Sequence, residues 1–470
     1  MKYRPSKRVV WWVIPVLPLA LMGVGLWGAG QPDSKAIATR GAAPPAEKKF
    51  SLVDPQSWGV SAEWFDDGMD ALMEWDHNPW KGKWKRDNRF GHRMEELAKS
   101  GRPEDKAELE RLRKLGREWY ERILARYPDL AVKPGKEIPR EENGLLQWQL
   151  FLKRLREGNK GGLFETSYPN EMVDHLRRNA EPDLTAIKAW LDANRTRIDE
   201  IREIGLISDR SSAGLTQEEM RWSGIMWSRY ASDALLLDAR AAVADGDMAR
   251  ALESIRALNG LADNVSASPD LVGMMVAGQM RADLQIYMMS ELLPAAGNVD
   301  VAEWEAASNL RLRSPSDVAA GIRTDWNQNM PDHLLPILSD TADPDSPRDG
   351  DYLAETYTRH MQALIQQAEG ASLAEYAAGT KVETSVEQLS RRSCELGMVN
   401  QWDPRISFLR QQEFTGLTEA AFAILKGEPM PLDPVYGKPY KWDPVKRWLT
   451  VPDAPNRLNY QVKPIRVPKM

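Results

Sequence analysis

The chain of 470 residues contains a single cysteine, Cys394. A disulfide within the chain needs two cysteines, and cysteine-ligated zinc or iron–sulfur sites need several, so the sequence excludes all of these. A lipoprotein anchor is excluded as well, because no cysteine lies near the N-terminus. Leu396 and Met398 follow Cys394, and these apolar neighbours favour a buried structural thiol over a reactive one.

Histidine is also scarce. No i,i+4 pair and no His-x-His pair occurs among the five histidines, which are His77, His92, His175, His333 and His360. Zinc sites usually place histidines at such spacings, so we predict no metal site and no cofactor. The aspartates of residues 339–352 do not change this, because Pro344 and Pro347 interrupt the alternating oxygens that a calcium loop needs.

The motifs of common enzyme classes are missing too. The chain has no P-loop and no G-x-S-x-G. Asp66 and Asp70 lie close together, but a chain with 68 acidic residues produces such neighbours by chance. We therefore predict no catalytic residue and favour binding over catalysis.

Positive charge is not in excess. The formal net charge is −6, which predicts no nucleic-acid partner, since such proteins usually carry a basic surface. The apolar fraction of 42% and the charged fraction of 28% are typical of a folded globular protein.

The N-terminal residues have the pattern of a membrane anchor. Residues 1–8 form a basic leader that contains Lys2, Arg4, Lys7 and Arg8. Residues 9–28 carry no charge, and a helix of that length spans about 30 Å, the thickness of the hydrocarbon core of a bilayer. We expect a single transmembrane helix in the cytoplasmic membrane, with the N-terminus in the cytoplasm and the body exported to the periplasm or another extracytoplasmic space.

A cleaved signal peptide that ends near Gly28-Ala29-Gly30 is the alternative, although the apolar cores of signal peptides are usually shorter. Both interpretations export the rest of the chain. Residues 29–50 are small, polar and proline-bearing, which predicts a flexible linker.

From residue 51 onward, apolar residues recur with the period of a helix. We predict an all-α fold of antiparallel helical hairpins, with a helical body at 51–338, a polar loop at 339–352, C-terminal helices at 353–428 and a turn-rich basic tail at 429–470. The expected helices are 61–76, 103–127, 145–157, 182–204, 216–243, 247–264, 269–292, 352–370, 383–396 and 417–425. Residues 241–252 contain A-x-x-x-GD-x-x-x-A-L and resemble one tetratricopeptide-type hairpin, but no 34-residue repeat surrounds them.

One stretch has the composition of a binding surface. Aromatic and basic side chains alternate in it, and the candidate binding residues are Trp75, Trp80, Lys81, Lys83, Trp84, Lys85 and Arg86. Aromatic rings among cations suit a glycan or an anionic membrane surface. Alternatively, the rings pack on the body while the cations stay in water, with no binding role.

The tail segment PLDPVYGKPYKWDPVKRW, residues 431–448, predicts two turns separated by an extended segment. The turn residues are Asp433, Pro434, Gly437, Pro439, Asp443 and Pro444. Aspartate and proline suit the first two positions of a type I turn, and glycine suits a left-handed residue. We expect residues 438–442 and 447–451 to pair, with the rings of Tyr440, Trp442 and Trp448 over the helical body. Residues 402–404 repeat the letters WDP of the second turn.

The segment DPVYGKPYKWDP, together with LLLDARAAVADGDMARALESIRALNGLADNVSASPDLVGMMVAG, resembles a broad group of uncharacterised bacterial proteins. The resemblance implies a single N-terminal membrane anchor, a helical exported body and a closing D-P-x-x-G-x-P segment, with no catalytic residues. A similar closing segment occurs in type II secretion pseudopilins, but this chain lacks their Gly-Phe processing site and the glutamate of their apolar run.

These observations favour a non-catalytic scaffold or assembly factor that binds a protein partner in the cell envelope. The alternative is a glycan-binding or glycan-cleaving protein of the cell envelope that uses the tryptophan-rich residues 58–93. A cleft that joins these tryptophans to a pair of carboxylates would favour the alternative.

Replacing Lys81, Lys83 and Lys85 with glutamate tests the basic aromatic stretch. If these cations bind an anionic surface, co-sedimentation with anionic vesicles or with glycan should fall. The matched control carries three glutamates in place of the lysines of residues 99–114. Equal retention of both variants and the parent chain would show that the stretch is a solvated face.

Overall fold

A computed structural model describes residues 96–132, 135–158, 163–166, 172, 175–176, 181–215, 225–267, 271–330, 350–380, 382, 403–453, 458, 462 and 464–469. These residues are mostly helical, which confirms the predicted all-α class. The predicted anchor, the basic aromatic stretch, Cys394 and the expected helices 61–76 and 383–396 lie outside them. Within the described part, no helix is long and apolar enough to cross a membrane.

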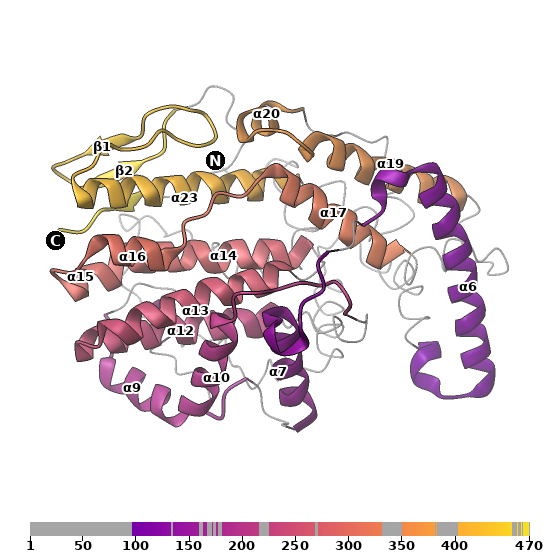
Figure 1. The fold of residues 1–470 in the computed structure, drawn as a ribbon, viewed down its shortest axis with the longest axis horizontal. Coiled ribbons are helices and arrows are strands. Elements are labelled where there is room, and N and C mark those ends of the chain that lie inside the picture. Colours follow the sequence, from indigo (N-terminus) through magenta and orange to yellow (C-terminus); the bar gives the residue numbers. More distant parts are fainter. Residues whose placement is uncertain are drawn as a thin grey trace, which may run out of the picture.

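Among the described residues, the elements before the tail are helices, with no extended sheet (Figure 1). The first α-helices are α6 (Pro103–Arg126), α7 (Gly144–Gly158), α9 (Leu184–Ala193), α10 (Arg195–Leu206), α12 (Ile225–Asp245), α13 (Met248–Ala267) and α14 (Leu271–Tyr287). The later ones are α15 (Leu293–Ala296), α16 (Val301–Ser308), α17 (Pro315–Asn329), α19 (Gly350–Ala368), α20 (Leu373–Ala378) and α23 (Pro404–Lys426). Short 3₁₀ and π segments are η1 (Pro128–Leu130), η2 (Arg140–Glu142) and η3 (Met288–Leu292).

The hairpin of α12 and α13 forms where the sequence predicts it. Gly246 has a φ of 77°, a conformation that glycine adopts without steric cost, and it ends α12. The Asp247 carboxylate accepts a hydrogen bond from the backbone N–H of Arg250 at 3.1 Å, so the expected cap at the start of α13 is confirmed.

The expected helix 182–204 is wrong in one respect, because it is broken in two at Asn194. The buried side chain of Asn194 accepts a hydrogen bond from Glu165 N at 2.8 Å and donates one to Thr166 Oγ1 at 2.7 Å. It also donates to Trp190 O at 2.8 Å. These contacts tie the break between α9 and α10 to a distant segment, so helical periodicity alone does not reveal it.

The expected helix 417–425 also begins much earlier, since α23 starts at Pro404. The WDP letters at residues 402–404 mark a helix start here and not a turn. The Asp403 carboxylate accepts a hydrogen bond from Arg405 N at 3.1 Å, and Pro404 occupies the first helical position, where its missing N–H costs nothing.

The tail is a small antiparallel sheet with strand order β1 (Lys441–Asp443), β2 (Trp448–Thr450) and β3 (Ile465–Arg466). The carboxylate of Asp433 accepts hydrogen bonds from Val435 N at 3.0 Å and Tyr436 N at 2.7 Å. The carboxylate of Asp443 accepts two in the same way, from Val445 N and Lys446 N, both at 3.0 Å.

Other parts of the tail agree with expectation to different degrees. Gly437 has a φ of 64°, as a left-handed turn residue requires, and Tyr440 is buried. Trp442 packs half-buried against the core, whereas Trp448 is 41% exposed and is less covered than expected. β3 was not expected, because only two residues of it pair and the sequence around them is proline-rich.

Helix α13 is the centre of the fold. Twelve of its 20 residues are buried, and it contacts α7, α10, α12, α14 and α16. In Figure 1, α12, α13, α14 and α23 lie in successive layers, and the tail sheet covers α23. One hydrophobic core runs through these layers and includes residues from Leu130 to Val467.

Two glycines allow α10 and α13 to cross in very close contact. A Cβ atom at Gly260 would lie 1.8 Å from the carbonyl oxygen of Gly205. A Cβ atom at Gly205 would lie 2.2 Å from the carbonyl oxygen of Ala257. Because both obstacles are backbone atoms, neither position accepts a larger residue unless the helices move apart.

Asp238 of α12 forms a buried ionic cluster that joins three helices. Its side chain is 0% exposed, and it accepts hydrogen bonds from Arg195 Nη1 at 2.9 Å, Arg202 Nη2 at 2.6 Å and Ser254 Oγ at 2.7 Å. Arg250 also pairs with it. The three arginines are matched by three carboxylates, because Asp192 pairs with Arg195 at 3.1 Å and Asp199 pairs with Arg202 at 2.7 Å.

Burial of Asp238 opposes its ionisation, but the hydrogen bond from Arg250, the charge of Arg202 and the hydrogen bond from Ser254 outweigh burial and lower its pKa to about 2. A lowered pKa means that the folded state favours the ionised form. The resulting stabilisation is complete above about pH 4 and is lost as the pH falls toward 2.

We expect Asp238→Asn to lower the free energy of unfolding by about 3–5 kcal/mol at pH 7, because it leaves three partly buried arginines without their shared carboxylate. The variant should also lose part of the acid dependence of stability below about pH 4. Urea unfolding at several pH values measures both effects. The control Asp192→Asn removes a carboxylate that is 75% exposed and should cost less than about 1 kcal/mol. Equal costs for the two variants would contradict the central role of Asp238.

Candidate functional site

The binding residues predicted from sequence, Trp75 to Arg86, lie outside the described residues. Most of the predicted turn residues 433–444 precede strand β1, and the carboxylates of Asp433 and Asp443 accept backbone hydrogen bonds there as turn residues. The strongest candidate site in the described part is elsewhere. It is the Asp263 cluster, which we define as Asp263, Arg210, Arg281 and Arg313.

Four separate segments bring the Asp263 cluster together. Asp263 lies on α13 and Arg281 on α14, and the two side chains form an ion pair. Arg210, which follows α10, pairs with the other carboxylate oxygen. Arg313, which precedes α17, has its Nη2 atom 3.7 Å from Asp263 Oδ1. The four side chains are 17–27% exposed, so the cluster is largely buried but reachable from solvent.

Hydrogen bonds fix the orientation of two of the arginines. Arg210 Nη2 donates to the carbonyl oxygens of Ile207 at 3.1 Å and Ser208 at 2.9 Å. Arg313 Nη1 donates to Ser266 Oγ at 2.6 Å, and the backbone N–H of Arg313 donates to Gln412 Oε1 at 2.7 Å. The guanidinium groups are therefore held in place before any ligand arrives.

The charges of the Asp263 cluster do not balance. Three arginines share the carboxylate of Asp263, and the larger further charges on Arg313 are those of Asp317 and Arg311. In the described part of the chain, the buried Nε of Arg210 has no hydrogen-bond partner.

The pKa values of two arginines of the cluster are lowered, chiefly by burial. Burial, followed by the charge of Arg313, lowers the pKa of Arg281 to about 10, although Asp263 opposes the shift. Burial also lowers the pKa of Arg313. Both groups remain charged at neutral pH, so the cluster presents a permanent positive field.

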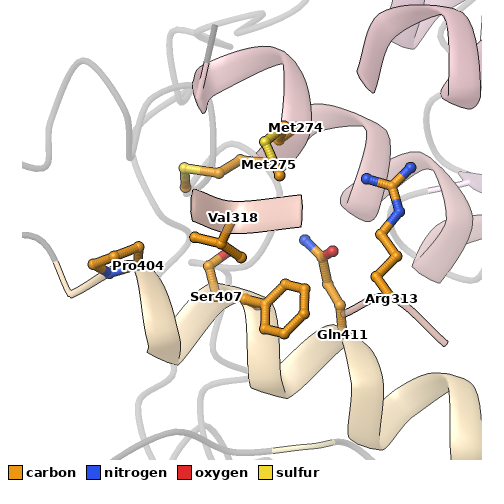
Figure 2. A pocket seen from close by; sticks show the side chains of 8 residues that line it. Met274, Met275, Arg313, Val318, Pro404, Ser407 and Gln411 are labelled. Atoms are coloured by element: carbon orange, nitrogen blue, oxygen red, sulfur yellow. The ribbon is translucent and has the colours of Figure 1, made fainter. Parts of the chain in front are cut away.

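Two hollows adjoin the cluster between α14 and α23. The polar hollow has a cavity volume of about 20 Å³, and its lining includes Arg281, Arg311, Arg313, Gln285, Gln411 and Gln412. The apolar hollow has a cavity volume of about 30 Å³, and its lining includes Met274, Met275, Val318 and Phe408. Arg313 and Gln411 line both. Figure 2 shows the side chains of Arg313 and Gln411 extending toward α14, next to the two methionines.

This arrangement is suited to recognition. Guanidinium groups bind carboxylates and phosphates through paired hydrogen bonds, and glutamine amides both donate and accept. Methionine side chains adapt to apolar groups of different shape. The site therefore places arginine and glutamine side chains beside a small apolar hollow.

A second buried polar contact lies at the far end of α14. His175 Nε2 is 2.6 Å from the hydroxyl of Tyr287, and both side chains are buried. Burial raises the pKa of this tyrosine. The contact ties the segment around residue 175 to α14, just before the π-helical turn η3, and the scattered histidines of the sequence give no sign of it.

Metal binding is not indicated in the described part of the chain, where no three His, Cys, Asp or Glu side chains are grouped to hold an ion.

Gly278 offers a direct test of the position of Gln411. A Cβ atom at Gly278 would lie 1.8 Å from Gln411 Nε2, which is the end of a flexible side chain. We expect Gly278→Ala to displace Gln411 from between the hollows and to change the free energy of unfolding by no more than about 1 kcal/mol. A crystal structure and urea unfolding of the variant check this.

The matched control is Gly260→Ala, where the obstacle is backbone. It should cost more than Gly278→Ala, on the order of 1–3 kcal/mol. If Gly278→Ala were the more damaging variant, or if Gln411 stayed in place, the geometry of the hollows described above would be wrong.

No protein-family model, no curated protein and no solved structure matches this chain.

Proposed function

We propose that this protein is a membrane-anchored, exported helical scaffold that acts by binding a protein partner in the cell envelope. Residues 9–28 are the proposed anchor and residues 29–50 the proposed linker. The observation that carries the binding role is the unbalanced positive charge of the Asp263 cluster beside two hollows.

The comparison with Asp238 supports this interpretation. At Asp238, three arginines are matched by three carboxylates, and the carboxylate at the centre is fully buried. At Asp263, the arginines outnumber the carboxylates and remain partly open to solvent. Holding like charges together in a largely buried place costs free energy, and an anionic group of a partner would offset that cost.

The helical hairpins also support a scaffold. The pair α12 and α13, with Gly246 and Asp247 at the turn, is the one that resembles a tetratricopeptide-type unit in sequence, and such units generally serve protein contacts. The chain offers one such hairpin, so we propose a protein-binding role from it and not a repeat array.

Native mass spectrometry of the full chain, extracted from the envelope in detergent, tests the proposal. We expect a discrete protein mass to accompany the chain. We expect Arg313→Gln to reduce that retention, because it removes one of the charges that the partner would meet. Circular dichroism establishes that the variant remains folded.

The matched control is Arg256→Gln. Arg256 lies on α13, its side chain is 47% exposed, and it pairs with Glu303 at 3.7 Å, away from the two hollows. It should retain the partner fully. A chain that carries no protein, or that retains its partner equally in both variants, would contradict the proposed role of the site. Co-purifying glycan fragments without a protein would favour the glycan alternative.

A further inference from the structure

We propose that the polar hollow between α14 and α23 binds a single chloride ion. The hollow has a cavity volume of about 20 Å³, and a cavity needs at least about 10–15 Å³ to hold one water molecule. It therefore suits one monatomic anion, which is only slightly larger than water, and excludes phosphate and sulfate. The inference does not depend on the proposed function, because a protein partner would meet the arginines from solvent, outside the hollow.

Positive charge lines the polar hollow. Arg281 reaches it from α14, and Arg311 and Arg313 reach it from the segment before α17. Among the described residues that line it, none is an aspartate or a glutamate, and Asp263 contacts Arg281 without lining the hollow. An ion in the hollow would therefore meet guanidinium groups with no carboxylate beside them.

Two of the guanidinium groups retain unused donors. Arg313 Nη2 is 3.7 Å from Asp263 Oδ1, too far for a hydrogen bond, while Arg313 Nη1 donates to Ser266 Oγ at 2.6 Å. Arg311 is exposed, and its side chain forms no ion pair or hydrogen bond with the part of the chain that the structure describes. Each guanidinium carries five N–H donors, so several remain for an anion.

Three acceptor oxygens of the lining side chains are already engaged, which favours an anion over a water molecule. Gln412 Oε1 accepts from Arg313 N at 2.7 Å, and Gln285 Oε1 accepts from the Thr418 hydroxyl at 3.4 Å. Thr415 Oγ1 accepts from Gln285 Nε2 at 3.5 Å. A buried water must donate hydrogen bonds as well as accept them, whereas chloride only accepts.

Chloride would also relieve the repulsion between the arginines. The charge of Arg313 adds to burial in lowering the pKa of Arg281 to about 10. An anion that both guanidinium groups contact would offset part of this repulsion. Only the folded chain brings these arginines together, so chloride would bind the folded state and stabilise it.

Thermal unfolding of the full chain in detergent tests the inference. The melting temperature is measured in sodium chloride, sodium bromide and sodium gluconate at the same ionic strength, since gluconate is too large for the hollow. General effects of each salt act on parent and variant alike, so the comparison between them isolates the site. We expect the melting temperature in chloride, relative to gluconate, to be a few degrees higher for the parent chain than for Arg311→Gln.

The matched control is Arg256→Gln. Arg256 is also an exposed arginine, with 47% of its side chain accessible, and it pairs with Glu303 away from the hollow. This variant should keep the full chloride dependence of the parent. Because both substituted side chains are exposed, both variants should fold, which circular dichroism checks.

A bromide soak of crystals of the full chain locates the ion. Bromide replaces chloride in such sites, and we expect an anomalous bromine peak between Arg281, Arg311 and Arg313. A water molecule in the hollow without that peak would overturn the inference. Equal chloride dependence in the parent and in Arg311→Gln would overturn it as well. Neither result bears on the proposed function, which fails if the full chain retains no protein partner.

Discussion

The enclosure of α13 is the constraint on which the rest of the fold depends. Because other helices surround it, its buried polar side chains must bond to those neighbours and not to water. Asn259 donates to the carbonyl oxygens of Ala307 and Ser308, both at 3.0 Å, at the end of α16. Ser254 donates to Asp238 of α12, and Asp263 pairs with arginines from three other segments. The polar groups of one central helix thus set the positions of the helices around it.

The two carboxylates at opposite ends of this network have different consequences. Nearby carboxylates neutralise the arginines around Asp238, and the ion pairs of Asp238 hold α10, α12 and α13 together. Asp263 gathers as many arginines with fewer carboxylates, and two small hollows adjoin it. The same residue types therefore form a balanced ionic cluster in one place and one with an excess of positive charge in another.

The sequence predicts those features that depend on neighbouring residues. Gly246 with Asp247, and Asp433 with Gly437, act through conformations and hydrogen bonds within a few residues, so the sequence pattern predicts them. The sequence does not predict the helix break at Asn194, because the hydrogen bonds of that residue reach residues 165 and 166. The sequence does not predict the Asp263 cluster either, because its four residues come from separate segments that the packing of α10, α13, α14 and α17 brings together. The π-helical turn η3 likewise leaves no pattern in the apolar spacing of residues 269–292.

The close crossing of α10 and α13 at Gly205 and Gly260 also affects the Asp263 cluster. Asp263 follows Gly260 on α13 by about one helical turn, and Arg210 follows Gly205 shortly after the end of α10. The backbone contact between Gly205 and Gly260 therefore sets the distance between Asp263 and Arg210, although it touches neither side chain. A methyl group added at either glycine would separate the helices and change that distance. The geometry of the Asp263 cluster thus depends on two residues that have no side chain.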